Sequence, residues 1–140
     1  MAYPRALAYD WGMIAHTGIA VKDFTKSKKF YQQTLKPLGY KLKYDYAKYK
    51  AAGFMQGGNT DFWISQQKST PGHVAFLAKS KKAVQAFYAA GLKAGGKDNG
   101  APGLRVNYSP DYYAAFVYDP SGNNIEACYF GEKAPKAKKK

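Results

Sequence analysis

One stretch of this chain occurs twice. Residues 16–39, HTGIAVKDFTKSKKFYQQTLKPLG, align without a gap with residues 73–96, HVAFLAKSKKAVQAFYAAGLKAGG, and 7 of the 24 aligned positions are identical. The protein has two histidines, His16 and His73, and both fall on the same position of the repeat. A repeat of this length is a supersecondary unit that cannot bury its apolar face alone. The chain is therefore expected to fold as two similar modules packed together.

Each copy begins with a short apolar run that predicts a strand, at residues 14–21 and 72–78. A helix follows, with Asp23 or Ser80 at its N-cap, an apolar stripe at three- and four-residue spacing, and glycine at its end. Extended segments separated by turn residues complete each copy. We expect these strands at residues 41–49, 51–57, 60–67, 103–108, 112–119 and 123–130.

The order of elements is thus βαβββ–βαβββ, with STPG at 69–72 as the hinge and DPSG at 119–122 as the turn of the last hairpin. This predicts an α+β fold in which two modules, at about residues 13–67 and 72–130, form a cupped mixed sheet. A chain of 140 residues fits one domain, which we place at residues 1–131. The lysine-rich segment 132–140 is too polar to pack, so we expect a disordered basic tail there.

The net charge of +13 creates a field that attracts anions. No recognised nucleic-acid motif accompanies the lysines, so we do not expect nucleic acid as a partner. No apolar run is long enough to span a bilayer, and the first 13 residues lack the pattern of a signal peptide. The single Cys128 cannot form an internal disulfide. These features predict a cytoplasmic protein with no membrane partner.

Strand alternation places three ionisable residues beside small or polar neighbours. His16 shares a strand face with Gly18 and Ala20, while His73 shares one with Ala75. Glu126 shares its face with two further residues, Asn124 and Cys128. Two imidazoles and one carboxylate can bind a divalent metal such as Zn, Ni, Mn or Fe, with positions left open for water or substrate. The alternative is that the histidines are satisfied by ordinary hydrogen bonds and that Glu126 pairs with a lysine at the rim.

Three motifs taken together carry a resemblance to a known family. They are HTGIAV to PLGY at 16–40, HVAF at 73–76 and PDYYAAFVYDPSGNNIEA at 110–127. Over about residues 13–130 the chain resembles the vicinal oxygen chelate superfamily of glyoxalases, bleomycin-resistance proteins and extradiol dioxygenases. The resemblance implies paired βαβββ modules around one divalent metal ion, with ligands on the first and last strands of each module.

Carried onto this sequence, the resemblance makes His16, His73 and Glu126 the metal ligands. The fourth family position falls near Phe62 or Trp63, neither of which can bind a metal. A set of three ligands is similar to that of the fosfomycin-resistance thiol transferases and the dioxygenases, whereas glyoxalase I resembles the epimerases in using four. Small members are commonly homodimers, so the site lies either within one chain or between two copies.

Other residues are candidates for binding a small-molecule substrate. Arg105 can hold a carboxylate or phosphate through two parallel hydrogen bonds. Tyr113 is expected to face the cavity as a hydrogen-bond donor, with Tyr112 turned towards the helices. Trp63 and Phe62 can form an apolar wall. For Arg105 the alternative is a surface position, and for the aromatic residues it is ordinary packing.

The favoured hypothesis is a metal-dependent lyase, isomerase or thiol transferase of the glyoxalase type, with Glu126 as a ligand that can also move a proton. Its substrate would be small, oxygen-rich and anionic. The main alternative is a metal-free protein that binds a drug or metabolite, as bleomycin-resistance proteins do. A ring-cleaving dioxygenase is a third possibility, and nucleic-acid binding through the basic tail is a fourth.

Overall fold

The computed structural model describes residues 14–131, whose elements follow the expected order. The strands of the first module are β1 (Thr17–Val21), β2 (Lys41–Tyr46), β3 (Ala51–Gln56) and β4 (Asn59–Gln66), with helix α1 (Phe24–Leu35) after β1. Those of the second are β5 (His73–Leu77), β6 (Lys97–Leu104), β7 (Tyr113–Tyr118) and β8 (Asn124–Tyr129), with α2 (Lys81–Lys93) after β5. Two 3₁₀ turns are η2 (Lys36–Leu38) and η3 (Ala47–Tyr49). The first 13 residues, for which no signal peptide is expected, and the expected basic tail at 132–140 lie outside the described residues.

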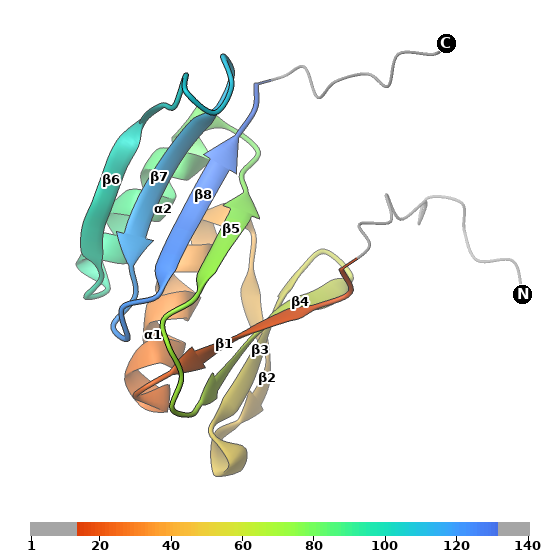
Figure 1. The fold of residues 1–140 in the computed structure, drawn as a ribbon. Coiled ribbons are helices and arrows are strands. Elements are labelled where there is room, and N and C mark those ends of the chain that lie inside the picture. Colours follow the sequence, from red (N-terminus) through yellow and green to blue (C-terminus); the bar gives the residue numbers. More distant parts are fainter. Residues whose placement is uncertain (1–13, 132–140) are drawn as a thin grey trace, which may run out of the picture.

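Each module forms its own four-stranded mixed sheet, in the orders β1-β4-β3-β2 and β5-β8-β7-β6. The first and last strands of a module are parallel neighbours, and the other pairs are antiparallel. Helix α1 packs on the first sheet and α2 on the second, so one face of each sheet is covered and the other faces outward (Figure 1). The predicted α+β fold of two βαβββ modules is confirmed.

The local signals for helix starts and turns are confirmed as well. The Asp23 carboxylate accepts a hydrogen bond from the backbone of Lys26, and the Ser80 hydroxyl accepts one from Ala83, both at 3.0 Å. The DPSG turn closes through a 3.0 Å hydrogen bond from the Gly122 N–H to the Asp119 carbonyl. Gly122 has φ +88°, a left-handed value that favours glycine.

The strand expected at residues 103–108 is wrong. The segment that pairs with β7 is Lys97–Leu104, and the chain then turns before β7 begins. The sequence of β6, KDNGAPGL, contains two glycines and a proline, a composition typical of loops. Pairing with β7 overrides this propensity, but the register shifts on both sides of Gly100. Such bulges are where an edge strand tolerates these residues.

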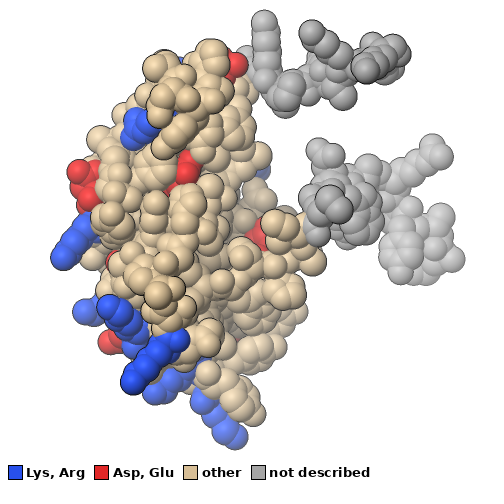
Figure 2. All heavy atoms as spheres, viewed as in Figure 1, with Lys and Arg blue, Asp and Glu red and all other residues tan. Residues whose placement is uncertain are grey.

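Lysine side chains gather at one end of the molecule. Figure 2 shows them over α1 and the turn that follows β2, on the face it presents. Lys28 forms an ion pair with Asp45 at 2.9 Å, which is partly exposed and contributes little to stability. Within residues 14–131, neither helix has the length and apolar content needed to cross a membrane.

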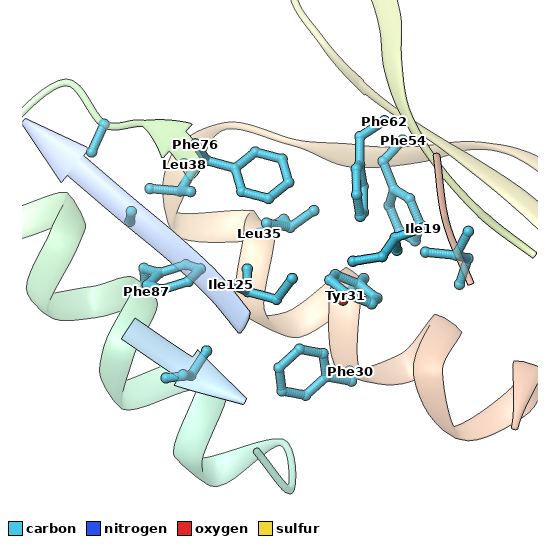
Figure 3. Packing of buried hydrophobic residues seen from close by; sticks show 14 of the residues in the cluster. Ile19, Phe30, Tyr31, Leu35, Leu38, Phe54, Phe62, Phe76, Phe87 and Ile125 are labelled. Atoms are coloured by element: carbon cyan, nitrogen blue, oxygen red, sulfur yellow. The ribbon is translucent and has the colours of Figure 1, made fainter. Parts of the chain in front are cut away.

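A single hydrophobic core joins the two modules (Figure 3). Tyr31 of α1, Phe62 of β4 and Phe76 of β5 are each less than 5% exposed. Phe62 contacts both of the others, with ring centroids 5.1 Å from Tyr31 and 5.0 Å from Phe76. Because this core forms between the modules, the uncovered outer faces of the sheets are left to carry the polar residues.

Candidate functional site

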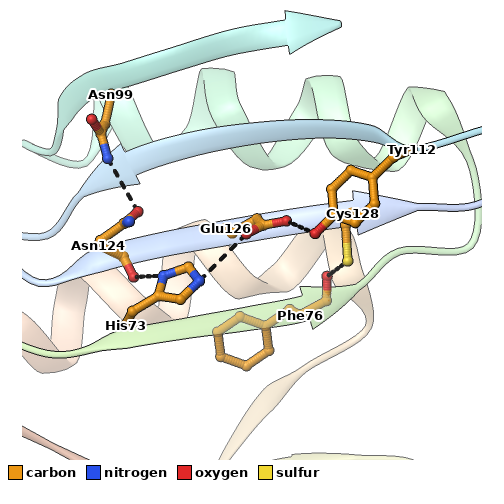
Figure 4. A network of polar contacts seen from close by, with 7 residues as sticks. All are labelled: His73, Phe76, Asn99, Tyr112, Asn124, Glu126 and Cys128. Atoms are coloured by element: carbon orange, nitrogen blue, oxygen red, sulfur yellow. Dashed lines mark hydrogen bonds and ion pairs between the residues drawn. The ribbon is translucent and has the colours of Figure 1, made fainter. Parts of the chain in front are cut away.

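The outer face of the second sheet brings together two of the residues predicted to bind metal. β5 and β8 run parallel with His73 opposite Asn124 and Ala75 opposite Glu126, so the two side chains project from neighbouring positions of one face. The imidazole Nε2 lies 3.4 Å from the Glu126 Oε1 (Figure 4). The His73 side chain is 49% exposed, whereas the Glu126 side chain is 5% exposed.

Each member of this pair is oriented by a partner behind it. The other ring nitrogen of His73, Nδ1, lies 2.9 Å from the Asn124 carbonyl oxygen, which can only accept a hydrogen bond. Nδ1 therefore carries a proton, and in neutral histidine Nε2 presents its lone pair to Glu126. The second oxygen of Glu126, Oε2, accepts a hydrogen bond from the Tyr112 hydroxyl. Both Nε2 and Oε1 are thus electron-pair donors that face each other.

Two electron-pair donors that face each other, one of them a buried carboxylate, need a positive charge that binds either one or both of them. Either a proton on Nε2 or a metal ion supplies this charge. Two ligands held at ~2.0–2.1 Å in tetrahedral geometry around Zn²⁺ lie ~3.4 Å apart, which matches the Nε2–Oε1 distance. Metal-bound histidine usually donates its other N–H to a carbonyl, as His73 does. The donor set therefore fits two ligands of a divalent metal.

His16, the third expected ligand, does not join this pair within one chain. It precedes β1 and its side chain is exposed. Among residues 14–131 no group of three His, Cys, Asp or Glu side chains is close enough to hold a metal ion. The chain by itself therefore presents two of the three expected ligands.

Trp63 occupies the position at which the family's fourth metal ligand is expected. In the second module, Glu126 lies two residues beyond the partner of His73. Extending the β1–β4 register by one residue places Asp61 opposite His16 and Trp63 at the position equivalent to Glu126. The Asp61 carboxylate accepts a 3.1 Å hydrogen bond from the Tyr40 hydroxyl. Position 63 thus carries an indole where a fourth metal ligand is expected.

The orientation expected for the two tyrosines is reversed. Tyr113 is buried against α2, and its hydroxyl accepts a 2.9 Å hydrogen bond from Gln85. Tyr112 lies on the outer face, where its ring contacts Tyr108 and Phe130 and its hydroxyl reaches Glu126. Burial and this hydrogen bond raise the pKa of Tyr112 well above its usual value, so it stays a proton donor at neutral pH.

The sequence held a signal for this orientation. The DPSG turn pairs Tyr118 with Asn124 and hence Phe116 with Glu126. Residues two apart share a strand face, so counting back from Phe116 places Tyr112 rather than Tyr113 beside Glu126. The register of the hairpin, rather than the hydrophobicity of either tyrosine, determines which one reaches the site.

The two aromatic residues proposed as a cavity wall lie on opposite faces of β4. Phe62 is 1% exposed and belongs to the core, so it does not form one apolar wall together with Trp63. Trp63 lies on the outer face and stacks on Tyr44, with ring centroids 5.6 Å apart and planes 8° apart. Gly53 lies between them in the sheet register, and a Cβ there would come within 2.9 Å of the indole. The missing side chain of this glycine makes room for the indole.

Arg105 and Cys128 both lie on the outer face of the second sheet. The guanidinium of Arg105 lies over the Phe116 ring, 5.5 Å from its centroid, and Phe116 is the β7 neighbour of Glu126. The Cys128 thiol donates to the Phe76 carbonyl at 3.6 Å. Burial raises its pKa to about 11, so it is a neutral thiol at physiological pH and a poor nucleophile.

Comparisons with known proteins agree on one family. The sequence model of the Glyoxalase/Bleomycin resistance protein/Dioxygenase superfamily matches residues 13–127. The structure is similar to a crystal structure of a glyoxalase/bleomycin resistance protein from Albidiferax ferrireducens T118, with 30% identity and a TM-score of 0.74 over 84% of this chain and 99% of that one. No curated protein matches the chain with significance.

Two further solved structures share the fold at lower identity. A glyoxalase/bleomycin resistance protein/dioxygenase family enzyme from Burkholderia phytofirmans PsJN has 16% identity and a TM-score of 0.63, over 84% of this chain and 98% of that one. A V278E mutant of glyoxalase I from Zea mays has 22% identity and a TM-score of 0.60, over 82% of this chain and 43% of that one.

Proposed function

Because this chain belongs to the Glyoxalase/Bleomycin resistance protein/Dioxygenase superfamily, we propose that it is a metal-dependent enzyme of the glyoxalase type. The proposed reaction is that of a lyase, an isomerase or a thiol transferase, on a small, oxygen-rich and anionic substrate. The observation that carries the proposal is the pair of facing donors, His73 Nε2 and Glu126 Oε1, each held from behind by a protein group. The half-exposed imidazole leaves Nε2 accessible from solvent.

The third ligand in this proposal is His16 of a second copy of the chain. His73 and Glu126 form half of a site, and no third ligand joins them within residues 14–131 of the same chain. A twofold symmetric dimer would bring each His16 to the His73 and Glu126 of the other copy and so form two equal sites. The repeat provides the geometric reason, because the two histidines occupy equivalent positions in the two modules.

A divalent ion bound there would polarise oxygen atoms of the substrate and stabilise negative charge that develops on them. Tyr112 holds the Glu126 carboxylate so that Oε1 points towards His73. The Asn124 carbonyl keeps the His73 proton on Nδ1. Glu126 is also the group able to accept or return a proton at the reacting atom, because its carboxylate reaches the exposed imidazole edge.

We expect wild-type protein reconstituted with Zn²⁺, Ni²⁺, Mn²⁺ or Fe²⁺ to retain about one metal ion per chain after dialysis. His73→Ala, Glu126→Ala and His16→Ala should each lower the bound metal at least about tenfold, since each removes one of three ligands. Elemental mass spectrometry measures the content, and Lys97→Ala serves as the control that keeps all three ligands. Failure of every metal to bind the wild-type protein would refute the proposal.

Mixing two variants that have each lost metal binding tests whether the site is shared between two copies of the chain. A dimer of His16→Ala with Glu126→Ala contains one intact site, made of His16 from the second variant and His73 with Glu126 from the first. After random exchange of subunits, about a quarter of the wild-type metal capacity should return. A site within one chain would recover no metal on mixing.

The main alternative, a metal-free binding protein, is favoured by one specific observation. Trp63, Tyr44 and Tyr46 form a stack of nearly parallel rings on the outer face of the first sheet, at the position where a fourth metal ligand would stand. Flat aromatic molecules stack on such surfaces, and nearby lysines favour anionic ones.

If this alternative holds, metal-free protein binds a flat aromatic anion, for which 2-naphthoate is a suitable probe. Replacing Trp63 with Ala should weaken that binding about tenfold, because it removes the largest ring of the stack. Tyr49→Ala is the matched control, since Tyr49 is 74% exposed and lies outside the stack. Isothermal titration calorimetry measures the affinity. Equal affinities of the two variants would exclude the stack as the binding surface.

A further inference from the structure

A pocket of about 300 Å³ lies on the outer face of the second sheet, beside the His73–Glu126 pair. Its position follows from the strand order β5-β8-β7-β6, because Phe116 of β7 is the neighbour of Glu126 and Gly100 of β6 is the neighbour of Phe116. The residues lining it are Asn99, Gly100, Arg105, Tyr108, Phe116 and Asn124. Asn124 also supplies the carbonyl that orients His73, so the pocket and the proposed metal site share a wall.

The positive charge of this pocket is the Arg105 guanidinium, which is held in place by its neighbours. Arg105 donates from Nη2 to the Ala101 carbonyl at 2.7 Å, and its guanidinium lies over the Phe116 ring. A Cβ at Gly100 would come within 3.1 Å of Nη2, and one at Gly103 within 3.2 Å of Nη1. The glycines that made β6 a poor strand by composition are therefore the residues that give the guanidinium its space.

The pocket lining is rich in hydrogen-bond donors. Among residues 14–131, no carboxylate lies within ion-pair distance of Arg105. The Asn99 amide donates to the side-chain oxygen of Asn124 at 3.1 Å, which leaves the Asn124 side-chain NH₂ and the Tyr108 hydroxyl as further donors. One planar guanidinium with neutral donors suits a planar group with a single negative charge, because its parallel N–H groups match the two oxygens of a carboxylate.

We propose that this pocket binds the carboxylate of a small organic acid and so defines the substrate class of the neighbouring site. This inference rests on the proposed function, since it assigns the substrate of the same site. Held by Arg105, the acid would direct the oxygen atoms next to its carboxylate towards His73 and Glu126. A 2-hydroxy or 2-oxo acid carries an oxygen atom on the carbon next to its carboxylate. Metal-assisted enolisation or addition requires an oxygen atom at that carbon.

The test uses metal-free protein, so that the outcome does not depend on a metal site. Lactate and its neutral amide, lactamide, are titrated at constant ionic strength, and the Gly100 and Gly103 amide signals are followed by NMR. We expect lactate to shift these signals in a saturable manner and lactamide not to. Arg105→Gln should weaken lactate binding about tenfold or more, because charge-assisted hydrogen bonds are lost. Lys97→Gln removes the same charge at the first residue of β6, whereas Arg105 follows its last residue, and should change the affinity less than about twofold.

Three results would overturn the proposal: absence of saturable lactate binding, equal effects of Arg105→Gln and Lys97→Gln, or tighter Arg105-dependent binding of methylphosphonate than of lactate. His73→Ala separates this proposal from the metal site. If lactate binding in metal-free protein needs Arg105 and survives His73→Ala, the pocket stands even where no metal binds. If metal binds but Arg105→Gln leaves lactate affinity unchanged, the metal site stands and the carboxylate pocket is refuted.

Discussion

Replacing Asp119 with Ala will lower the free energy of unfolding by about 4 kcal/mol. Asp119 begins the DPSG turn between β7 and β8 and is 4% exposed. Its carboxylate accepts hydrogen bonds from the Tyr31 hydroxyl at 2.5 Å and from the Asn123 side-chain amide at 2.8 Å. It also accepts two backbone N–H groups at 2.8 Å, those of Ser121 and Asn123. Alanine leaves the Tyr31 hydroxyl and both backbone N–H groups without this acceptor, and each buried donor left unpaired is destabilising.

The effect extends beyond the turn because the same network joins the two modules. Asn123 donates to the Ala20 carbonyl of β1 at 3.0 Å and accepts the Gly72 N–H at 2.8 Å. The Ser121 hydroxyl accepts the Lys22 N–H at 2.9 Å. A turn of the second module is thus held against the first strand and helix of the other, and Asp119 holds that turn in its conformation.

Urea denaturation followed by circular dichroism measures this loss of stability. Asp98→Ala is the matched control, because the Asp98 carboxylate also accepts a tyrosine hydroxyl and a backbone N–H but is exposed to solvent. We expect that control to lose less than about 1 kcal/mol. Tyr31→Phe, which removes one donor and leaves the rest, should fall between the two. Equal losses for Asp119→Ala and Asp98→Ala would contradict the assigned role.

Much of the fold could be predicted because the signals for it are local. Helix caps at Asp23 and Ser80 and the DPSG turn act through hydrogen bonds within a few residues, and the repeat shows that the modules are alike. The strand at Lys97–Leu104 could not be predicted in this way, because its own propensity favours a loop. Its partner strand β7 supplies the hydrogen bonds that make it a strand.

The candidate site could be predicted in part for the same reason. His73 and Glu126 meet because each module pairs its first and last strands, a relation that the repeat already suggests. Whether His16 joins them depends on how two whole modules, of one chain or of two, lie against each other. No short pattern encodes that arrangement, since it results from many core contacts at once. The faces of Tyr112 and Tyr113 depended on one residue of register, and an error of one residue reverses every side chain.

The second large effect is expected at Phe62, which the sequence had suggested as part of a substrate pocket. Phe62→Ala should lower the free energy of unfolding by about 4 kcal/mol, from lost apolar burial and the cavity that remains. The ring is 1% exposed and contacts Phe54 of its own module and Phe76 of the other, at centroid distances of 5.9 and 5.0 Å. Its removal therefore weakens the contact between modules as well as the first sheet. Thermal and urea unfolding measure the change.

Trp63→Ala is the matched control, because Trp63 is the next residue of the same strand and points to the opposite face. We expect it to lower the free energy of unfolding by less than about 2 kcal/mol, since its ring is partly exposed. Phe62→Leu, expected to lose about 1 kcal/mol, provides a measurable variant if Phe62→Ala does not fold. If Trp63→Ala is the more destabilising change, the inner and outer faces of β4 have been assigned the wrong way round. That result would also remove the stack of rings from the surface proposed to bind flat molecules.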